Sequence, residues 1–161
     1  MKHAETMKIV PIFNDVNLDT LAQSVGDSIN MSKYHHCTFV VNFQTLATDA
    51  TYIIVYSGAT DAALTSALTF RYAYGGATIG SASCDVLSAA STSANLEIDQ
   101  TTYPNHMVII EVDASVMDLD NNEEWLTFTF NDTDTGSSGN ASVYAILTPR
   151  YKGDRSLSAL V

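Results

Sequence analysis

The sequence predicts an all-β protein, an antiparallel β-sandwich of jelly-roll-like type with about eight or nine short strands and little helix. Apolar and polar residues alternate with a period of two over short runs, which end at Gly, Asn, Asp and Ser. The alternation is clearest near the C-terminus, where Leu126, Phe128 and Phe130 share one face and Thr127 and Thr129 share the other. Charged residues are only 16% of the chain, and Thr, Ser and Ala take their place on flat, part-buried sheet surfaces.

The strand candidates follow one another with polar turns between them. The strong ones are residues 37–43, 51–57, 67–74, 107–113, 125–130 and 141–148. Residues 8–13 are a further candidate, and the weaker ones are residues 79–86 and 95–99. Pro11 has no N–H to donate, so it confines residues 8–13 to the edge of a sheet. Residues 74–77, Tyr-Gly-Gly-Ala, are typical of a hairpin turn. Asp113 or Ser115 is a candidate cap for one helical turn.

The length of 161 residues fits one domain with a real core. We expect residues 1–151 to form a single β-sandwich domain, in which residues 1–13 are an N-terminal arm or an edge strand. Residues 152–161 have no partner strand in the sequence and are expected to form a C-terminal tail. The N-terminus lacks the apolar core of a signal peptide, and no apolar run approaches the length of a membrane span. The sequence therefore predicts a protein made in the cytoplasm of its host.

The distribution of charge along the chain indicates which classes of binding partner are excluded. A net charge of −11 argues against nucleic acid and against anionic membrane surfaces, because both need Lys and Arg. No Lys or Arg occurs between Arg71 and Arg150, whereas Asp and Glu accumulate from Asp85 to Asp134. The last residues carry a net positive charge, so the basic tail of one copy could bind the acidic surface of another copy or of a partner. The alternative is that the acidic residues form a solvated face that keeps the protein soluble.

The candidate chemical sites fail simple tests. His35 and His36 are neighbours in a strand and point to opposite faces, and no second His/Cys cluster could complete a zinc site. The acidic run from Asp118 places Glu123 where a calcium loop needs Gly and Thr129 where it needs Glu. No Ser or Cys lies in a nucleophile elbow. We therefore expect no catalytic, cofactor-binding or metal-binding residues and no enzymatic activity, with an irregular calcium site in the acidic loops left open.

Tyrosines form two stripes within the predicted strands. Tyr52 and Tyr56 share a face of one strand, and Tyr72 and Tyr74 share a face of another. Such stripes can line a sugar-binding platform or a protein interface. The alternative is that they cover the rim of the sandwich core.

The order of the segments resembles a known family. Residues 13–18, Phe-Asn-Asp-Val-Asn-Leu, precede a loop and then the strand at residues 34–40. Residues 108–114 are followed by residues 117–122, Met-Asp-Leu-Asp-Asn-Asn, and the last strand ends in Pro-Arg-Tyr at residues 149–151. This pattern resembles capsid decoration (cement) or minor head structural proteins of tailed bacteriophages. It covers most of the chain, and residues 58–104 match least well.

The resemblance implies a β-sandwich that forms a homotrimer or homodimer and clamps neighbouring subunits of the major capsid protein on the surface of the virion. The two terminal segments are the expected contact elements. Their contact residues are Lys8, Ile9, Pro11, Arg150, Tyr151, Lys152, Arg155, Leu157, Leu160 and Val161. One alternative is a tail or head-completion structural protein of a phage. A second alternative is a carbohydrate-binding β-sandwich module.

Overall fold

The computed structural model describes residues 6–18, 23–46, 51–132, 139–151 and 158–160. Its elements are β1 (Lys8–Asn17), β2 (Ser24–Val25), β3 (Ile29–Asn30), η1 (Met31–Lys33), β4 (Tyr34–Phe43), β5 (Thr51–Gly58), β6 (Ser66–Ala67), β7 (Phe70–Tyr74), β8 (Ser91–Ser93), β9 (Leu96–Ile98), β10 (Met107–Asp113), η2 (Ala114–Val116), η3 (Leu119–Asn121), β11 (Trp125–Asp132) and β12 (Asn140–Pro149). The all-β prediction is confirmed.

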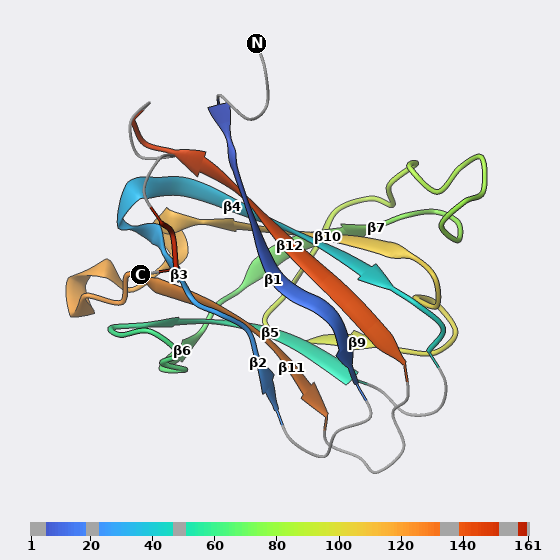
Figure 1. Ribbon diagram of the computed structural model, residues 1–161, viewed down its shortest axis with the longest axis horizontal. Coiled ribbons are helices and arrows are strands. Elements are labelled where there is room, and N and C mark those ends of the chain that lie inside the picture. Colours follow the sequence, from blue (N-terminus) through green and yellow to red (C-terminus); the bar gives the residue numbers. More distant parts are fainter. Residues whose placement is uncertain (1–5, 19–22, 47–50, 133–138, 152–157, 161) are drawn as a thin grey trace.

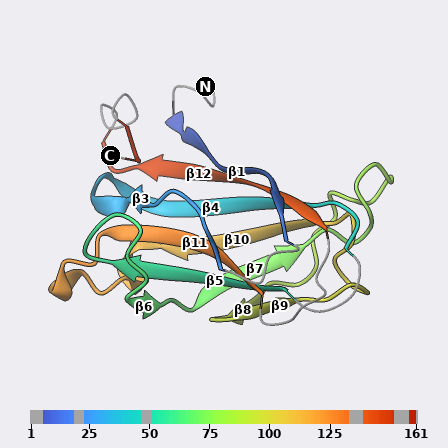
Figure 2. The ribbon, with the colours of Figure 1, turned by 60° about the horizontal axis from the view of Figure 1, so that its bottom comes forward.

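The strands form two antiparallel sheets, and the chain passes repeatedly between them (Figure 1). Sheet A has the order β1-β12-β4-β10-β7-β8, and sheet B has the order β2-β11-β5-β6, with β3 paired to β11 and β9 paired to β5. In Figure 2 the strands of sheet A fan out from β1 and β12 through β4 and β10 to β7 and β8. The first and last long strands, β1 and β12, therefore lie side by side.

The core lies between the sheets and is built by the predicted alternation. On β11, Leu126, Phe128 and Phe130 are buried and belong to the core. The ring centroid of Phe128 lies 5.0 Å from that of Phe39 on β4 and 5.1 Å from that of Phe130. Aromatic side chains bury a large apolar area each, so this cluster, which joins both sheets, is a main source of stability.

Strand β1 occupies an edge of sheet A, as Pro11 predicts. Its pairing with β12 is irregular, because the register shifts between Pro11 and Phe13 and again between Phe13 and Val16. Asp15 has a positive φ of 56°. These irregularities blunt the edge against pairing with another chain.

Helical structure among the described residues is limited to single 3₁₀ turns, apart from a helical assignment at Thr6 alone. The predicted cap is confirmed, since the Asp113 carboxylate accepts a hydrogen bond of 2.8 Å from the Ser115 backbone N–H at the start of η2. None of the helices among these residues is long and apolar enough to cross a membrane.

Two local predictions were wrong in the middle of the chain. The single strand expected at residues 67–74 is divided, since β6 joins sheet B and β7 joins sheet A. The weak strand at residues 79–86 is instead a series of turns, in which Ser81, Cys84 and Val86 each donate a backbone hydrogen bond three residues back. Small residues and Gly80 at φ +94° favour these turns over a ladder.

The predicted tight hairpin at residues 74–77 is also replaced by a longer excursion. The chain leaves β7 after Tyr74 and returns to it at Ser88, whose backbone N–H donates a hydrogen bond of 2.8 Å to the Tyr74 carbonyl oxygen. Strand β8 follows from Ser91. Gly75 is required because a Cβ there would lie 2.5 Å from the carbonyl oxygen of Cys84. The glycine therefore serves a close approach of two backbone segments rather than a two-residue turn.

The described part of the predicted tail returns to the body of the protein. The Asn30 backbone N–H donates a hydrogen bond of 2.8 Å to the Ala159 carbonyl oxygen, and the Ala159 side chain is only 1% exposed. Leu160, expected to contact a partner, packs against the core of its own chain.

Candidate functional site: a basic corner and an apolar sheet face

The pairing of three strands brings together basic residues that are distant in the sequence. Lys8 at the start of β1 lies opposite Leu147 near the end of β12. Just beyond β12, the Arg150 backbone N–H donates a hydrogen bond of 2.8 Å to the Lys33 carbonyl oxygen, directly before β4. The Arg150 Nε donates a second bond of 3.2 Å to the Tyr34 carbonyl oxygen. We call Lys8, Lys33 and Arg150, with the adjacent Tyr151, the basic corner.

The basic corner contains three of the predicted contact residues, Lys8, Arg150 and Tyr151. Tyr151 exposes 74% of its surface. Two further predicted residues, Ile9 and Pro11, are exposed on the neighbouring strand β1. The remaining predicted contact residues Lys152, Arg155, Leu157 and Val161 lie outside the described residues. The described parts of the N-terminal and C-terminal contact elements are therefore joined by the β1–β12 pairing.

The side of sheet A that faces away from the core is unexpectedly apolar. One row of cross-strand neighbours consists of Pro11, Tyr144, Val40, Ile109 and Ala73. The next row consists of Ile9, Ile146, Thr38, Glu111 and Arg71. None of these side chains belongs to the core cluster, whereas their neighbours along each of the four strands β1, β12, β4 and β10 do. We call these two rows the sheet A face.

The composition of the sheet A face is unusual for an antiparallel sheet. One side of such a sheet normally meets water and carries polar residues. Here Ile9 is 62% exposed and Tyr144 is 36% exposed, and Val40 and Ile109, on the next strands β4 and β10, are half-buried. An exposed apolar area of this kind is a mark of an interaction site. The only charged members are Glu111 and Arg71, which are cross-strand neighbours of opposite sign.

The sequence analysis did not identify this face, although a signal was present. Residues 40–41, 108–110 and 145–147 are continuous apolar runs that break the alternation. Such runs are typical of strands that are covered on both sides. In this fold the described residues cover only one of the two sides.

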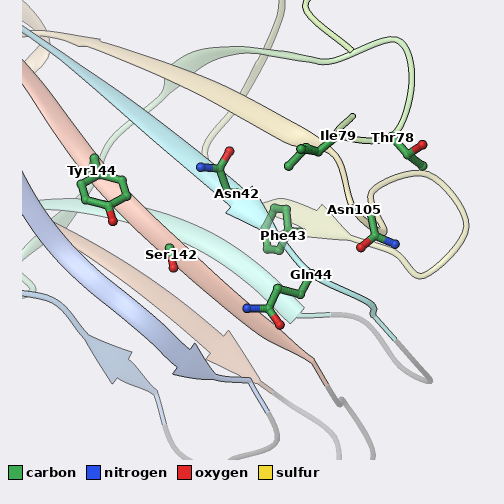
Figure 3. A pocket seen from close by; sticks show the side chains of 8 residues that line it. All are labelled: Asn42, Phe43, Gln44, Thr78, Ile79, Asn105, Ser142 and Tyr144. Carbon is green, nitrogen blue, oxygen red and sulfur yellow. The ribbon is translucent and has the colours of Figure 1, made fainter. Parts of the chain in front are cut away.

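A shallow hollow lies where the sheet A face meets the loops at one end (Figure 3). Its volume is about 560 Å³. It is lined by Asn42, Phe43, Gln44, Thr78, Ile79, Asn105, Ser142 and Tyr144. No charged side chain lines it, so it offers amide and hydroxyl groups beside two aromatic side chains, Phe43 and Tyr144.

A second, smaller hollow of about 190 Å³ lies on the other side of the same face. Its lining includes Ala73 and Ile109 of the sheet A face and Leu87 from the loop that follows β7. Leu87 is 45% exposed. The hollow is therefore an apolar depression open to solvent.

The acidic residues that were candidates for metal binding form hydrogen bonds with neighbouring side chains. The Asn121 amide donates a hydrogen bond of 2.7 Å to the Asp118 carboxylate. The buried Glu123 carboxylate accepts hydrogen bonds from the hydroxyls of Ser57 and Ser66, which tie β5 and β6 to the start of β11. Within the described ranges, no three His, Cys, Asp or Glu side chains are grouped to hold a metal ion.

His35 and His36 lie at an irregularity that the sequence did not predict. Thr148 of β12 pairs with His36, but the next residue, Pro149, pairs with Tyr34, so β4 contains one extra residue at this point. The simple alternation assumed for the two histidines is therefore interrupted here. His36 lies opposite Asp113 of β10.

The two tyrosine stripes differ in their surroundings. Tyr72 and Tyr74 pack against the core, and the Tyr74 ring meets Tyr103 edge-on at 5.4 Å. This stripe covers the rim of the core, as the alternative reading expected. Tyr52 and Tyr56 are half-buried on the outer side of sheet B.

The comparisons with known proteins do not assign a family. Neither the scan against protein-family models nor the search of curated proteins found a match. Among solved structures, the chain is similar to the SPBc2 prophage-derived protein YomS, with a TM-score of 0.45 and 11% sequence identity. The alignment covers 88% of this chain and 91% of that one.

Proposed function

We propose that the chain is a non-enzymatic structural protein of a phage virion that binds the capsid surface and stabilises the shell by bridging major capsid subunits. The proposal extends the resemblance in the sequence to the features of the folded chain.

The basic corner is the observation that carries the proposal. The chain has a net charge of −11, yet Lys8, Lys33 and Arg150 meet at the ends of three adjacent strands. An acidic partner surface would therefore be attracted to this corner and repelled elsewhere. The exposed Tyr151 adds a large, amphipathic side chain of the type enriched in protein interfaces.

Binding through such a corner gains strength from repetition. A single exposed ion pair contributes only about 0.2–1 kcal/mol. A subunit that contacts two neighbouring capsid proteins converts the second contact into an intramolecular event, which raises the overall affinity without new contacts. The role therefore requires no deep cleft and no catalytic residue.

The test is the binding of purified protein to particles of the parent phage that lack it. Lys33→Gln should weaken the affinity about threefold at low salt, because it removes one positive charge from the corner. Arg71→Gln is the matched control, since it removes one charge from sheet A outside the corner. Glu97→Gln is a second control, since it removes one exposed charge from β9, outside both the corner and the sheet A face. Equal binding by Lys33→Gln, Glu97→Gln and the unaltered protein would contradict the role of the corner.

Copy number separates capsid decoration from the other phage role. Quantitative mass spectrometry of purified virions should give a ratio to the major capsid protein of one or a simple fraction. A few copies per particle would instead support a tail or head-completion protein. Absence from the virion would overturn the structural proposal.

Carbohydrate binding is a second candidate, favoured by the neutral hollow of Figure 3. Asn42, Gln44 and Asn105 supply planar amides, and Tyr144 supplies an aromatic side chain beside them. Ligand pockets combine an apolar wall with a few placed polar groups, and a neutral sugar matches a lining without charges.

Calorimetry with a panel of neutral oligosaccharides tests this second candidate. Tyr144→Ala should abolish the heat of binding, and Tyr52→Ala, on the outer side of sheet B, should leave it unchanged. No heat with any oligosaccharide, or equal loss in both variants, would exclude the hollow as a sugar site.

A further inference from the structure

The sheet A face has the properties of a surface that is buried in an interface. Its central row crosses five strands from β1 to β7 without a charged residue. We propose that a second copy of the chain covers it, so that two sheets A pack face to face about a two-fold axis that runs along β4. This inference is independent of the capsid proposal.

Charge explains why this face can meet its own copy. Two molecules of charge −11 repel each other, and like charges placed across an interface cost several kcal/mol. The sheet A face is neutral, because Arg71 balances Glu111 as its cross-strand neighbour. Face-to-face packing therefore places no net acidic charge in the contact.

The shape of the face is complementary to itself under this symmetry. In sheet A, β4 has β12 and β1 on one side and β10 and β7 on the other. A two-fold axis along β4 therefore places β1 of each copy over β7 of the other. Ile9 and Pro11, which project from β1, then meet the apolar hollow lined by Ala73, Ile109 and Leu87.

The size of the face suits a weak, reversible contact. Five strands about 4.8 Å apart and two outward residues about 6.8 Å apart span roughly 330 Å². Two copies would bury about 650 Å² in total, which is the size of a weak, transient contact. We therefore expect a dimer that dissociates on dilution. Pairing along the β1 edge is a poorer route, because Pro11 and the register shifts interrupt its ladder.

Sedimentation velocity of the whole protein from about 1 to about 100 µM is the first test, over a range suited to a small interface. The mass should rise with concentration from that of one chain to that of two. Val40→Lys puts a charge at the axis and should weaken the dimer by about tenfold or more, since a buried unpaired charge is costly.

A matched control is available in the other sheet. Ile54→Lys replaces a half-buried β-branched residue on the outer side of β5, a strand inside sheet B. It should leave the dimer intact. Thermal unfolding of both variants at low concentration checks that each monomer is folded, and Tyr144→Ala offers a milder second change to the face.

Cross-linking tests the position of the axis. Val40→Cys in a Cys84→Ser background should be linked to its own copy by a short bismaleimide, whereas Ile54→Cys should not. Cys37 is fully buried, and burial raises the pKa of its thiol well above the usual value, so it should not compete.

The outcomes decide the proposal. Concentration-dependent dimerisation that Val40→Lys weakens and Ile54→Lys does not, with cross-linking through position 40, would support it. A monomer at all concentrations would overturn it, and so would a dimer that Val40→Lys leaves unchanged.

Discussion

The two sides of sheet A are both apolar, but only one of them is buried by the fold. Phe39 and Val40 are neighbours on β4, yet Phe39 packs against Phe128 in the core and Val40 faces outward. In an antiparallel sheet with one solvated side, the second position would normally be polar. The inner side therefore serves the stability of the monomer, and the outer side is the one that carries the proposed dimer contact.

Truncation on the inner side should have the largest effect. Phe39→Ala removes a fully buried ring in contact with Phe128, so it should lower the free energy of unfolding by about 3–5 kcal/mol. Chemical denaturation of the monomer measures this loss. A loss below about 1 kcal/mol would mean that the core does not depend on this cluster.

The rim of the inner side should show an effect of pH. Burial raises the pKa of Tyr103 to about 12, and the neighbouring Tyr72 adds to the shift. The pKa of Tyr103 in the folded protein lies above the unfolded value of about 10. The contribution of the neutral Tyr103 to the free energy of unfolding is therefore fully present below pH 10 and is lost between about pH 10 and 12.

Tyr103→Phe cannot ionise and should remove this part of the alkaline loss. The difference between the two proteins should reach at most about 2 kcal/mol near pH 12. Denaturation at pH 8 and pH 11.5 compares them, and parallel losses in both would assign the effect to other groups.

An intermediate effect is expected where β10 ends. Asp113 caps η2, and hydrogen bonds from Ser115 hold the pKa of its carboxyl below the usual range. Asp113→Ala should lower the free energy of unfolding by about 1 kcal/mol at pH 7, a typical cost of losing a cap. The difference should shrink as the pH falls through the lowered pKa, because the protonated carboxyl is a weaker cap. Asp113→Asn should retain most of the stability.

The smallest effect on the monomer is expected on the outer side. Val40→Thr should change the free energy of unfolding by no more than about 0.5 kcal/mol, as expected away from the core. Val41→Thr is the matched change on the inner side and should cost about 1–3 kcal/mol, because it buries a hydroxyl. Measured at low concentration, equal losses would remove the distinction between the two sides.

Several features of the fold could be predicted because they depend on local sequence. Alternation on β11 is a property of neighbouring residues, so Leu126, Phe128 and Phe130 were assigned correctly to the core. Pro11 lacks an N–H whatever its partner, so it marked β1 as an edge strand. Asp113 was recognised as a cap because its acceptor bonds a donor two residues away.

Other features depend on which strands meet, and no local pattern contains that information. Residues 67–74 look like one strand, yet they are divided between two sheets by pairings with β5 and β10. The basic corner exists only because β12 lies between β1 and β4, and this brings Lys8 and Lys33 to Arg150.

By itself, the sequence determined the all-β class, the inner side of each long strand, the edge position of β1 and the acidic character of the chain. Each follows from the chemistry of residues a few positions apart. The tertiary structure alone decided the strand order, the basic corner and the apolar sheet A face. These features arise from antiparallel pairings between strands up to about 140 residues apart, whose register is set by packing of the whole core.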